Sequence, residues 1–364
     1  MYDLLIVGAG LFGSSFANVC INSNKKVLII DKREHIGGNC FTKKENNIDV
    51  HMYGPHIFHT NNKKIWDYVN KFSLFNNFIN RPKVSYDNKI YSFPINLMTL
   101  YQLWGISDPI KAKEKLEKVR IKIESPKNLE EWALSQIGYD LYQTFIYGYT
   151  KKQWNCEPKD LPSSIIKRIP IRLNFNDNYF NDDYQGIPAG GYTNMILNMV
   201  EGADIVLGVD YFKDREYWDS KAKNIIFTGK IDEFYNYSYG RLDYRGLRFE
   251  TTNMTIDDYQ GNAVINYTDY KIPYTRIIEH KHFNLKEDQK NTIITKEYPD
   301  EYDDSKIPYY PMNNIKNNDL YNKYHNINTS QNKIIFGGRL AEYKYFDMHQ
   351  IIGSSLSKAE KFLN

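Results

Sequence analysis

The sequence predicts an α/β protein: a Rossmann-like dinucleotide-binding domain with an inserted helical domain and an antiparallel β-sheet domain. Three observations support this prediction. A glycine-rich turn joins an apolar run to a small-residue segment within residues 4–17. Residues 97–155 carry helical patterns with no strand pattern between them, and residues 244–310 carry several short strand patterns. The expected boundaries are residues 1–78, 190–232 and 330–364 for the dinucleotide-binding domain, 97–165 for the helical domain, and 79–96, 166–189 and 233–329 for the sheet domain.

The first βαβ unit is predicted at residues 4–31. An apolar run leads into a G-x-G-x-x-G turn, a helical pattern follows, and a second apolar run ends at Asp31. In such a unit Gly8 permits the tight turn, Gly10 lets the backbone approach a pyrophosphate, and Gly13 lets the helix pack on the strand. Asp31 stands where an acid binds a ribose hydroxyl. An ordinary α/β turn leaves this acid unexplained, so the unit indicates dinucleotide binding.

Two further glycine pairs favour FAD as the dinucleotide. Gly37 and Gly38 follow the second strand, where loop amides meet phosphate; the alternative is a surface turn. NAD enzymes seldom need this second loop, whereas FAD proteins of the glutathione-reductase type commonly carry it. The pair at 337–338 follows the strand pattern 334–336 and precedes Arg339. A helix expected from residue 349 would place its N-terminus near the flavin ring.

The bulk composition excludes several functional classes. The net charge is +3, from 47 basic and 44 acidic residues, so no global field for nucleic acid exists. The three cysteines have no metal spacing and fit a reducing compartment. We find no signal peptide and no apolar run near the ~20 residues of a membrane span. These observations predict a cytoplasmic protein that binds neither nucleic acid nor a membrane.

The remaining elements follow from hydrophobic periodicity and turn residues. Alternation around Asp87 and Asn88 predicts a hairpin over residues 83–93. Helices are expected over residues 62–75, 97–103, 110–119, 129–137, 139–149 and 195–200, and strands over 206–209, 225–228, 247–250, 263–267, 276–280 and 292–296.

Residues 51–60 hold three of the eight histidines. A zinc site is disfavoured because Gly54 and Pro55 interrupt the stretch and no cysteine partner is present, and we predict no metal. We expect residues 54–56 to form a fixed turn against the cofactor, with His56 or His59 near the flavin ring.

Residues 165–172 place two arginines around a proline, ahead of an asparagine-rich loop. This pattern fits a mobile anion-binding lid. It equally fits a solvated basic turn, and the residues alone leave both interpretations open.

With these motifs in place, the chain resembles the bacterial UDP-galactopyranose mutase family over nearly its full length. The chain departs from the family's pattern at Asp31, where many members have glutamate, and at Pro55, where several have alanine. Its motifs lie at residues 8–13, 35–39, 53–60, 148–154, 167–170, 273–280 and 337–345.

The resemblance implies a reversible, redox-neutral ring contraction of UDP-galactopyranose to UDP-galactofuranose, a precursor of cell-surface polysaccharide. FAD would act in its reduced form, with flavin N5 attacking the anomeric carbon and displacing UDP, which returns after the sugar has reclosed on another hydroxyl. An external electron donor would reduce the flavin, and family members are commonly homodimers.

The resemblance also assigns roles to residues. Arg168 and Arg276 match the diphosphate-binding arginines. Arg339 and Asp347 match positions beside the flavin and substrate, and His59, a candidate catalytic residue, would lie with His56 on the other flank of the flavin. Tyr149 matches the uracil-stacking ring and Trp154 the sugar end. The phosphate-contacting tyrosines correspond to Tyr179, Tyr310 and Tyr345. Positions at the cofactor correspond to Gly8, Gly10, Phe12, Gly13, Asp31, Lys32, Gly38, Asn39, His56, Ile57, Arg339, Asp347 and Met348.

Two other classes compete with this interpretation. A flavin oxidoreductase of the amine-oxidase type shares the FAD fold, but paired arginines for a diphosphate would be out of place there. A non-enzymatic module like the Rab-escort proteins shares the fold without flavin, and the intact glycine loops and Asp31 argue against it. Acceptance of UDP-N-acetylgalactosamine stays open, because it depends on the space near His59.

Overall fold

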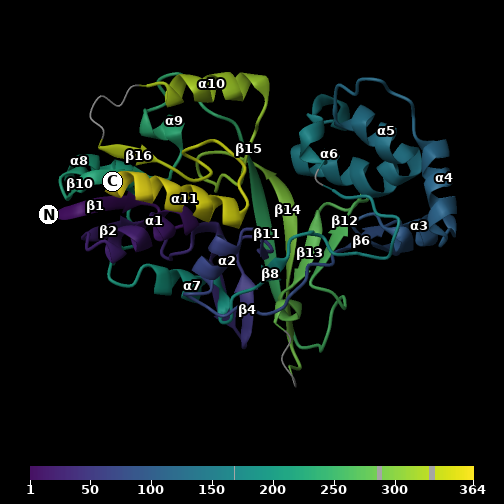
Figure 1. Ribbon diagram of the computed structural model, residues 1–364, viewed down its shortest axis with the longest axis horizontal. Coiled ribbons are helices and arrows are strands. Elements are labelled where there is room, and N and C mark those ends of the chain that lie inside the picture. The colour runs from purple at the N-terminus through teal and green to yellow at the C-terminus, as the bar shows by residue number, and fades with distance from the viewer. Residues whose placement is uncertain (168, 285–288, 328–332) are drawn as a thin grey trace. The chain divides into compact units, whose positions relative to one another are not determined.

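The structure is a computed structural model, which describes residues 1–167, 169–284, 289–327 and 333–364 (Figure 1). The chain forms two compact units. Unit 1 comprises residues 1–77, 182–246 and 302–364, and unit 2 comprises residues 78–181 and 247–301. No described helix is long and apolar enough to cross a membrane.

Unit 1 is built on a five-stranded parallel sheet in the order β16-β10-β1-β2-β9. Its central strands are apolar and buried, as expected for a parallel sheet covered on both faces. β9 ends at Val206, so the strand predicted over residues 206–209 lies too late in the sequence. The strands are β1 (Tyr2–Val7), β2 (Val27–Ile30), β9 (Asp204–Val206), β10 (Ala222–Phe227) and β16 (Ile334–Phe336).

Two helices pack side by side on this sheet: α1 (Leu11–Asn22) follows the first glycine turn, and α11 (Met348–Leu363) ends the chain (Figure 1). The Ser355 hydroxyl donates to the Phe12 carbonyl at 2.7 Å, which ties α11 to the first turn of α1. The other helices of unit 1 are α2 (Lys63–Val69), α7 (Gly191–Met199), α8 (Arg215–Asp219), α9 (Ile231–Phe234), α10 (Ile315–His325) and the 3₁₀ turns η1 (Gly38–Cys40) and η5 (Tyr211–Asp214).

Short antiparallel pairs complete unit 1. β3 (Thr42–Glu45) pairs with β4 (Ile48–His51). β5 (Phe58–Thr60) pairs with β8 (Tyr184–Gly186), which joins the histidine-rich loop to a segment more than 100 residues later.

Unit 2 contains most of an antiparallel-rich sheet in the order β11-β14-β13-β12-β6-β7. The predicted hairpin is confirmed, and Asp87 and Asn88 adopt positive φ values of 48° and 57°, as a tight hairpin turn requires. The strands are β6 (Lys83–Tyr86), β7 (Lys89–Ser92), β11 (Tyr244–Met254), β12 (Val264–Tyr267), β13 (Arg276–Glu279) and β14 (Thr292–Glu301). Residues 244–246 of β11 belong to unit 1, where they pair with β15 (Tyr310–Pro311).

Helices gather beside the β6–β7 hairpin in unit 2 (Figure 1). The break predicted between two helices falls at Gly138, whose φ of 71° interrupts α5. A Cβ atom there would lie 2.4 Å from the Val119 carbonyl oxygen, so the close approach of the backbone requires glycine. The helices are α3 (Leu97–Trp104), α4 (Pro109–Val119), α5 (Leu129–Tyr142), the π-helical turn η2 (Gln143–Tyr147), α6 (Gly148–Trp154), and the 3₁₀ turns η3 (Pro158–Asp160), η4 (Ser163–Ile165) and η6 (His280–Phe283).

The two units divide the chain differently from the three expected regions. Residues 79–96 and the helices at 97–165 share unit 2 because they share one core, in which Val84 and Phe93 of the hairpin region pack in the same cluster as Leu100 and Phe145. An amphipathic hairpin buries its apolar face against whatever element lies over it, and sequence periodicity does not say which element that is.

Candidate active site

The positions of the first turn are occupied by glycine for different physical reasons. A Cβ on Gly13 would lie 2.1 Å from the Gly8 carbonyl oxygen, and one on Gly8, with φ of 114°, would lie 1.9 Å from the Thr228 hydroxyl. A Cβ on Gly10 would meet nothing closer than 3.9 Å, the Cα of Gly38. Gly10 therefore has no internal steric reason to be glycine. Open space over bare backbone is what a pyrophosphate needs at this position.

The two glycine loops lie against each other. The Gly37 N–H donates to the Ala9 carbonyl at 2.8 Å. Both oxygens of Asp31 accept main-chain N–H groups, from Ala9 at 2.8 Å and from Arg33 at 2.9 Å. The predicted ribose-binding acid thus also ties the loops together, which the sequence analysis missed.

Arg33 was also missed by sequence reasoning. Its Nη2 donates to Asn39 Oδ1 at 2.9 Å, and its guanidinium lies 4.7 Å from the centre of the Tyr53 ring. Its Nη1 atom is buried, and no hydrogen-bond partner is present among the described residues. A buried guanidinium nitrogen without an acceptor is costly and fits an anionic group of a ligand. Lys32, predicted at the cofactor, is exposed.

The N-terminus of α11 meets the second glycine loop. Asp347 caps α11 through a capping box with Gln350, and Met348 Sδ lies 3.7 Å from the Cys40 thiol. Arg339 Nε donates to the Phe346 carbonyl at 2.8 Å, and the guanidinium lies 4.8 Å from the centre of the Tyr345 ring. The N-terminus of α11 therefore lies beside the second glycine loop, and its dipole favours a negatively charged group there.

Two of the predicted tyrosines come together in unit 1. The rings of Tyr310 and Tyr345 stack with centroids 6.1 Å apart.

Ile57 and Phe12, predicted at the cofactor, are buried, and Phe12 fills the space above Gly337.

The turn at residues 54–56 is fixed by its own hydrogen bonds. His56 Nδ1 lies 2.8 Å from the Gly54 carbonyl oxygen, and the His56 N–H donates to His51 Nδ1 at 3.1 Å. The Tyr192 hydroxyl donates to the His56 carbonyl at 3.0 Å. His51 is thus a buried structural residue.

His59 Nδ1 contacts the Asp182 carboxylate, and the His59 ring lies edge-on to His349 at 5.2 Å. Burial lowers the pKa of His349.

Among the described residues, the one group of side chains with metal-ligand spacing lies elsewhere, in unit 2. There His282 Nε2 lies 3.1 Å from Asp258 and 3.4 Å from Glu279. The Glu279 side chain, held by the N–H groups of Tyr259 and Gln260, has its pKa lowered to about 2: burial opposes the charge, and the hydrogen bonds from His282, Thr292 and these amides outweigh it. Ion pairs and hydrogen bonds hold these three side chains together.

In unit 2, Arg276 is held by a buried acid. Its Nε lies 2.8 Å from Glu297 Oε2, and the Glu297 side chain is fully buried. The Thr275 hydroxyl donates to the other Glu297 oxygen at 3.2 Å. The buried Glu297 carboxylate thus places a negative charge beside Nε of Arg276, the residue predicted to bind the diphosphate. Arg168 lies outside the described residues.

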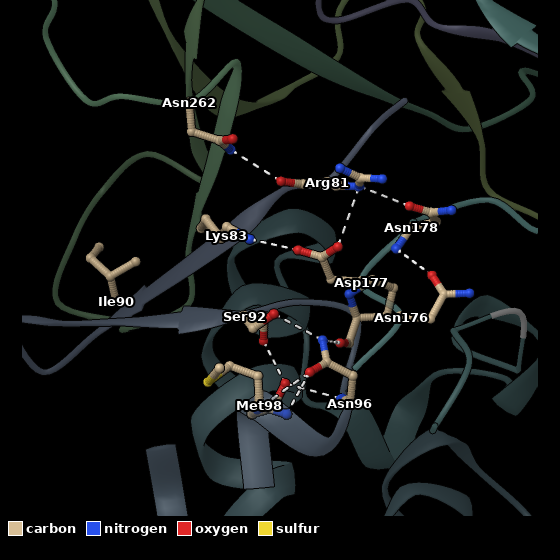
Figure 2. A network of polar contacts seen from close by, with 12 residues as sticks. Arg81, Lys83, Ile90, Ser92, Asn96, Met98, Asn176, Asp177, Asn178 and Asn262 are labelled. Carbon is tan, nitrogen blue, oxygen red and sulfur yellow. Dashed lines mark hydrogen bonds and ion pairs between the residues drawn. The ribbon is translucent and has the colours of Figure 1, made fainter. Parts of the chain in front are cut away.

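The asparagine-rich loop after Arg172 is anchored within unit 2. Asp177 pairs with Lys83 at 2.8 Å and with Arg81 at 3.4 Å, and Arg81 also donates to Asn178 at 2.8 Å (Figure 2). Arg172 donates to the Asn178 carbonyl at 2.6 Å. Hydrogen bonds and ion pairs thus anchor the asparagine-rich loop from Arg172 onward.

The predicted aromatic residues of unit 2 lie at the edge of the helical core. Trp154 and Tyr179 pack partly buried against it, and the Tyr179 ring is 6.3 Å from Phe93. Tyr149 is half-buried on α6, whose next turn carries Lys152. The Lys152 ammonium lies within 2.7–2.9 Å of four carbonyl oxygens of residues 267–274, the segment that leads into Arg276.

The parallel sheet, the crossing glycine loops and the helix N-terminus of unit 1 define an α/β protein with a dinucleotide-binding site. A family profile described as an NAD(P)-binding Rossmann-like domain matches residues 6–72. A second family profile, described as UDP-galactopyranose mutase, matches residues 144–345.

Relatives extend the match over the whole chain. A dTDP-fucopyranose mutase of Escherichia coli is 40% identical, covering 100% of this chain and 99% of the relative. A probable UDP-galactopyranose mutase of Klebsiella pneumoniae is 40% identical, covering 100% of this chain and 95% of the relative. The fold resembles a crystal structure of reduced UDP-galactopyranose mutase with a TM-score of 0.76 at 14% identity. The match covers 100% of this chain and 96% of that structure's chain. The chain belongs to the UDP-galactopyranose mutase family, whose members are isomerases.

Proposed function

We propose that the protein interconverts UDP-galactopyranose and UDP-galactofuranose with reduced FAD bound in unit 1. Family membership over the full chain carries this proposal. The open backbone at Gly10 and the orphaned Arg33 nitrogen support a bound dinucleotide. The residues that would hold it are Gly8, Gly10, Phe12, Gly13, Asp31, Lys32, Arg33, Gly38, Asn39, His56, Ile57, Arg339, Asp347 and Met348.

When bound and reduced, FAD would supply at N5 the nucleophile that exchanges with UDP at the anomeric carbon. The protein has to orient the sugar, exclude water and stabilise the charge that develops on UDP. The glycine loops and α11 would hold the cofactor in place for this.

Arg276 would bind the diphosphate in a direction set by Glu297, and Arg168 would add a second positive charge when the segment before Arg172 closes. Loss of one such donor typically lowers kcat by ~10²–10³-fold. We therefore expect Arg276→Ala to show a loss of this size, and Arg168→Ala a loss that also raises KM. Unchanged turnover in Arg168→Ala would contradict the lid.

The aromatic residues would hold the rest of the nucleotide sugar. Tyr149 would stack on uracil and Trp154 would line the sugar end. Tyr179, Tyr310 and Tyr345 would donate to phosphate oxygens.

The decisive experiment uses dithionite-reduced, FAD-loaded protein with UDP-galactofuranose, and follows UDP-galactopyranose by chromatography. We expect conversion with reductant and almost none without it. Equal activity in oxidised protein would contradict the flavin nucleophile, and oxygen- or NAD-linked turnover of an amine would establish an oxidoreductase.

A second substrate is favoured by a specific observation: the E. coli relative named dTDP-fucopyranose mutase is as similar as the Klebsiella one. The same reduced protein should be assayed with dTDP-fucofuranose in parallel. The larger kcat/KM identifies the substrate, and UDP-N-acetylgalactosamine in a third assay tests the room near His59.

The proposal includes a homodimer in the cytoplasm and an external electron donor that keeps FAD reduced. Neither nucleic acid nor a membrane has a role in it. Light scattering of the holoenzyme tests the dimer.

A further inference from the structure

The pair formed by His59 and Asp182 joins two segments of unit 1 that are 123 residues apart in sequence. His59 lies on β5, and Asp182 lies just before β8, its antiparallel partner. The two side chains are only 11% and 21% exposed, so the contact between Nδ1 and Oδ2 is largely shielded from water.

Asp182 is itself fixed by its surroundings. Its Oδ1 accepts from Asn61 Nδ2 at 2.6 Å, and the Asn61 carbonyl oxygen Oδ1 accepts from the Asp183 N–H at 2.8 Å. The Gln185 side chain donates to the Asp182 main-chain carbonyl at 2.8 Å. The carboxylate therefore has one oxygen held by Asn61 and the other directed at the imidazole.

We propose that Asp182 is the positioning residue for His59. An ionised carboxylate only accepts hydrogen bonds, so it keeps a proton on Nδ1 and makes Nε2 of the neutral ring the acceptor nitrogen. A ring in this tautomer receives a hydroxyl hydrogen at Nε2, as a sugar hydroxyl would offer. The inference rests on the proposed function in one respect, the placement of His59 beside the sugar.

The other groups that face His59 fit this assignment. His349 lies edge-on to it from the second position of α11, next to the cap residue Asp347. His349 Nδ1 is buried and finds no hydrogen-bond partner in the part of the chain that the structure describes. Burial lowers the pKa of His349, which disfavours a positive charge beside His59. The Asp182 carboxylate thus faces both rings: it contacts His59 Nδ1 and acts electrostatically on His349, as Asp347 does.

The test begins with the imidazole itself. Long-range ¹H–¹⁵N spectra of histidine-labelled protein report the tautomer of each ring, and loss of a signal in His59→Gln assigns His59. In the wild type we expect the proton on Nδ1. In Asp182→Asn, whose amide can donate to Nδ1, we expect the proton on Nε2. Asp183→Asn is the matched control because it changes the adjacent exposed acid, and it should leave the tautomer unchanged.

Kinetics of the FAD-loaded, reduced enzyme complete the test. Removal of a group that orients an active-site side chain typically costs 10–100-fold in activity. We expect a loss of ~10–100-fold in kcat for Asp182→Asn with an unchanged flavin spectrum, partial recovery in Asp182→Glu, and wild-type values for Asp183→Asn. The low-pH limb of the kcat/KM profile should shift in Asp182→Asn alone.

An Asp182→Asn variant with the wild-type tautomer and wild-type kcat would overturn the assignment. If the wild type fails to isomerise any of the nucleotide sugars, the proposed function fails instead. The tautomer measurement, which needs no substrate, would then still decide whether Asp182 sets the state of His59.

Discussion

At the residue scale, the three glycines of the G-x-G-x-x-G turn are required for unrelated reasons. Gly13 and Gly8 are glycines because of neighbouring protein atoms, whereas Gly10 faces open space. A sequence motif does not separate packing from ligand binding, but the structure does.

This difference gives a paired prediction. Gly10→Ala should fold with a stability near that of the wild type, because its backbone is extended with φ of −81° and the new methyl has room. It should lose FAD, because the methyl occupies the path of the pyrophosphate. Gly13→Ala should lose several kcal/mol from the clash with Gly8. Thermal unfolding of apo-protein and FAD fluorescence titration separate the two effects. A Gly10→Ala protein that binds FAD normally would contradict the pyrophosphate assignment.

His280 predicts a pH dependence of stability. Burial lowers its pKa to about 3, and its Nε2 lies 2.7 Å from the Thr295 hydroxyl. In the unfolded chain histidine titrates near pH 6.5. The unfolded state therefore binds the extra proton between these values, and this contribution to stability is lost as pH falls below ~6.5.

Between pH 6.5 and pH 5 we expect His280 to remove about 1.5 kcal/mol of unfolding free energy. Urea unfolding at several pH values measures it, with His280→Gln as the reference that lacks this component. The lowered pKa values of His35 and His349, due mainly to burial, contribute equally to both proteins. Parallel pH curves for the two proteins would show that His280 is charged in the fold.

At the element scale, helix α6 orders the loop that leads to Arg276. Burial lowers the pKa of Lys152 to about 8, so its ammonium still predominates at pH 7 and donates to the four carbonyl oxygens. The neighbouring Lys151 points elsewhere, pairing with the Glu157 carboxylate at 2.6 Å.

The two lysines provide a matched comparison. Lys152→Met should destabilise the protein by ~3 kcal/mol, because buried carbonyls lose their donor. Lys151→Met should cost less than ~1 kcal/mol, as expected for a partly exposed ion pair. Equal values in denaturant unfolding would contradict the structural role of Lys152. Because the loop precedes Arg276, Lys152→Met should also raise KM for the nucleotide sugar.

At the scale of the whole molecule, both units are discontinuous in sequence. The proposed dinucleotide site would draw on all three segments of unit 1. The glycine loops come from the first, Tyr192 and Asp182, which contact His56 and His59, come from the second, and α11 comes from the third.

FAD binding should therefore stabilise unit 1 across these distant segments. At a free concentration 100 times Kd, the gain is about 2.7 kcal/mol, or ~100-fold slower hydrogen exchange of amides that exchange by unfolding of the unit. Exchange measured with and without FAD should show protection in β1, β10 and α11 and little in α4 and α5. Uniform protection of both units would mean that they unfold together.

The sequence by itself determined most of the elements and the class of fold. Strand, glycine turn, helix and acid lie within residues 4–31, and the hairpin turn and the break at Gly138 are equally local. Backbone preferences and hydrophobic periodicity act over a few residues, so single-chain patterns suffice for them.

Only the tertiary structure decided how the side chains are held. Asp182 pairs with His59, Glu297 with Arg276, and the orphaned Arg33 nitrogen is recognisable only once its burial is known. The division into two units likewise depended on which elements share a core. Partners far apart in sequence leave no periodic trace, because their contact is created by packing of whole elements.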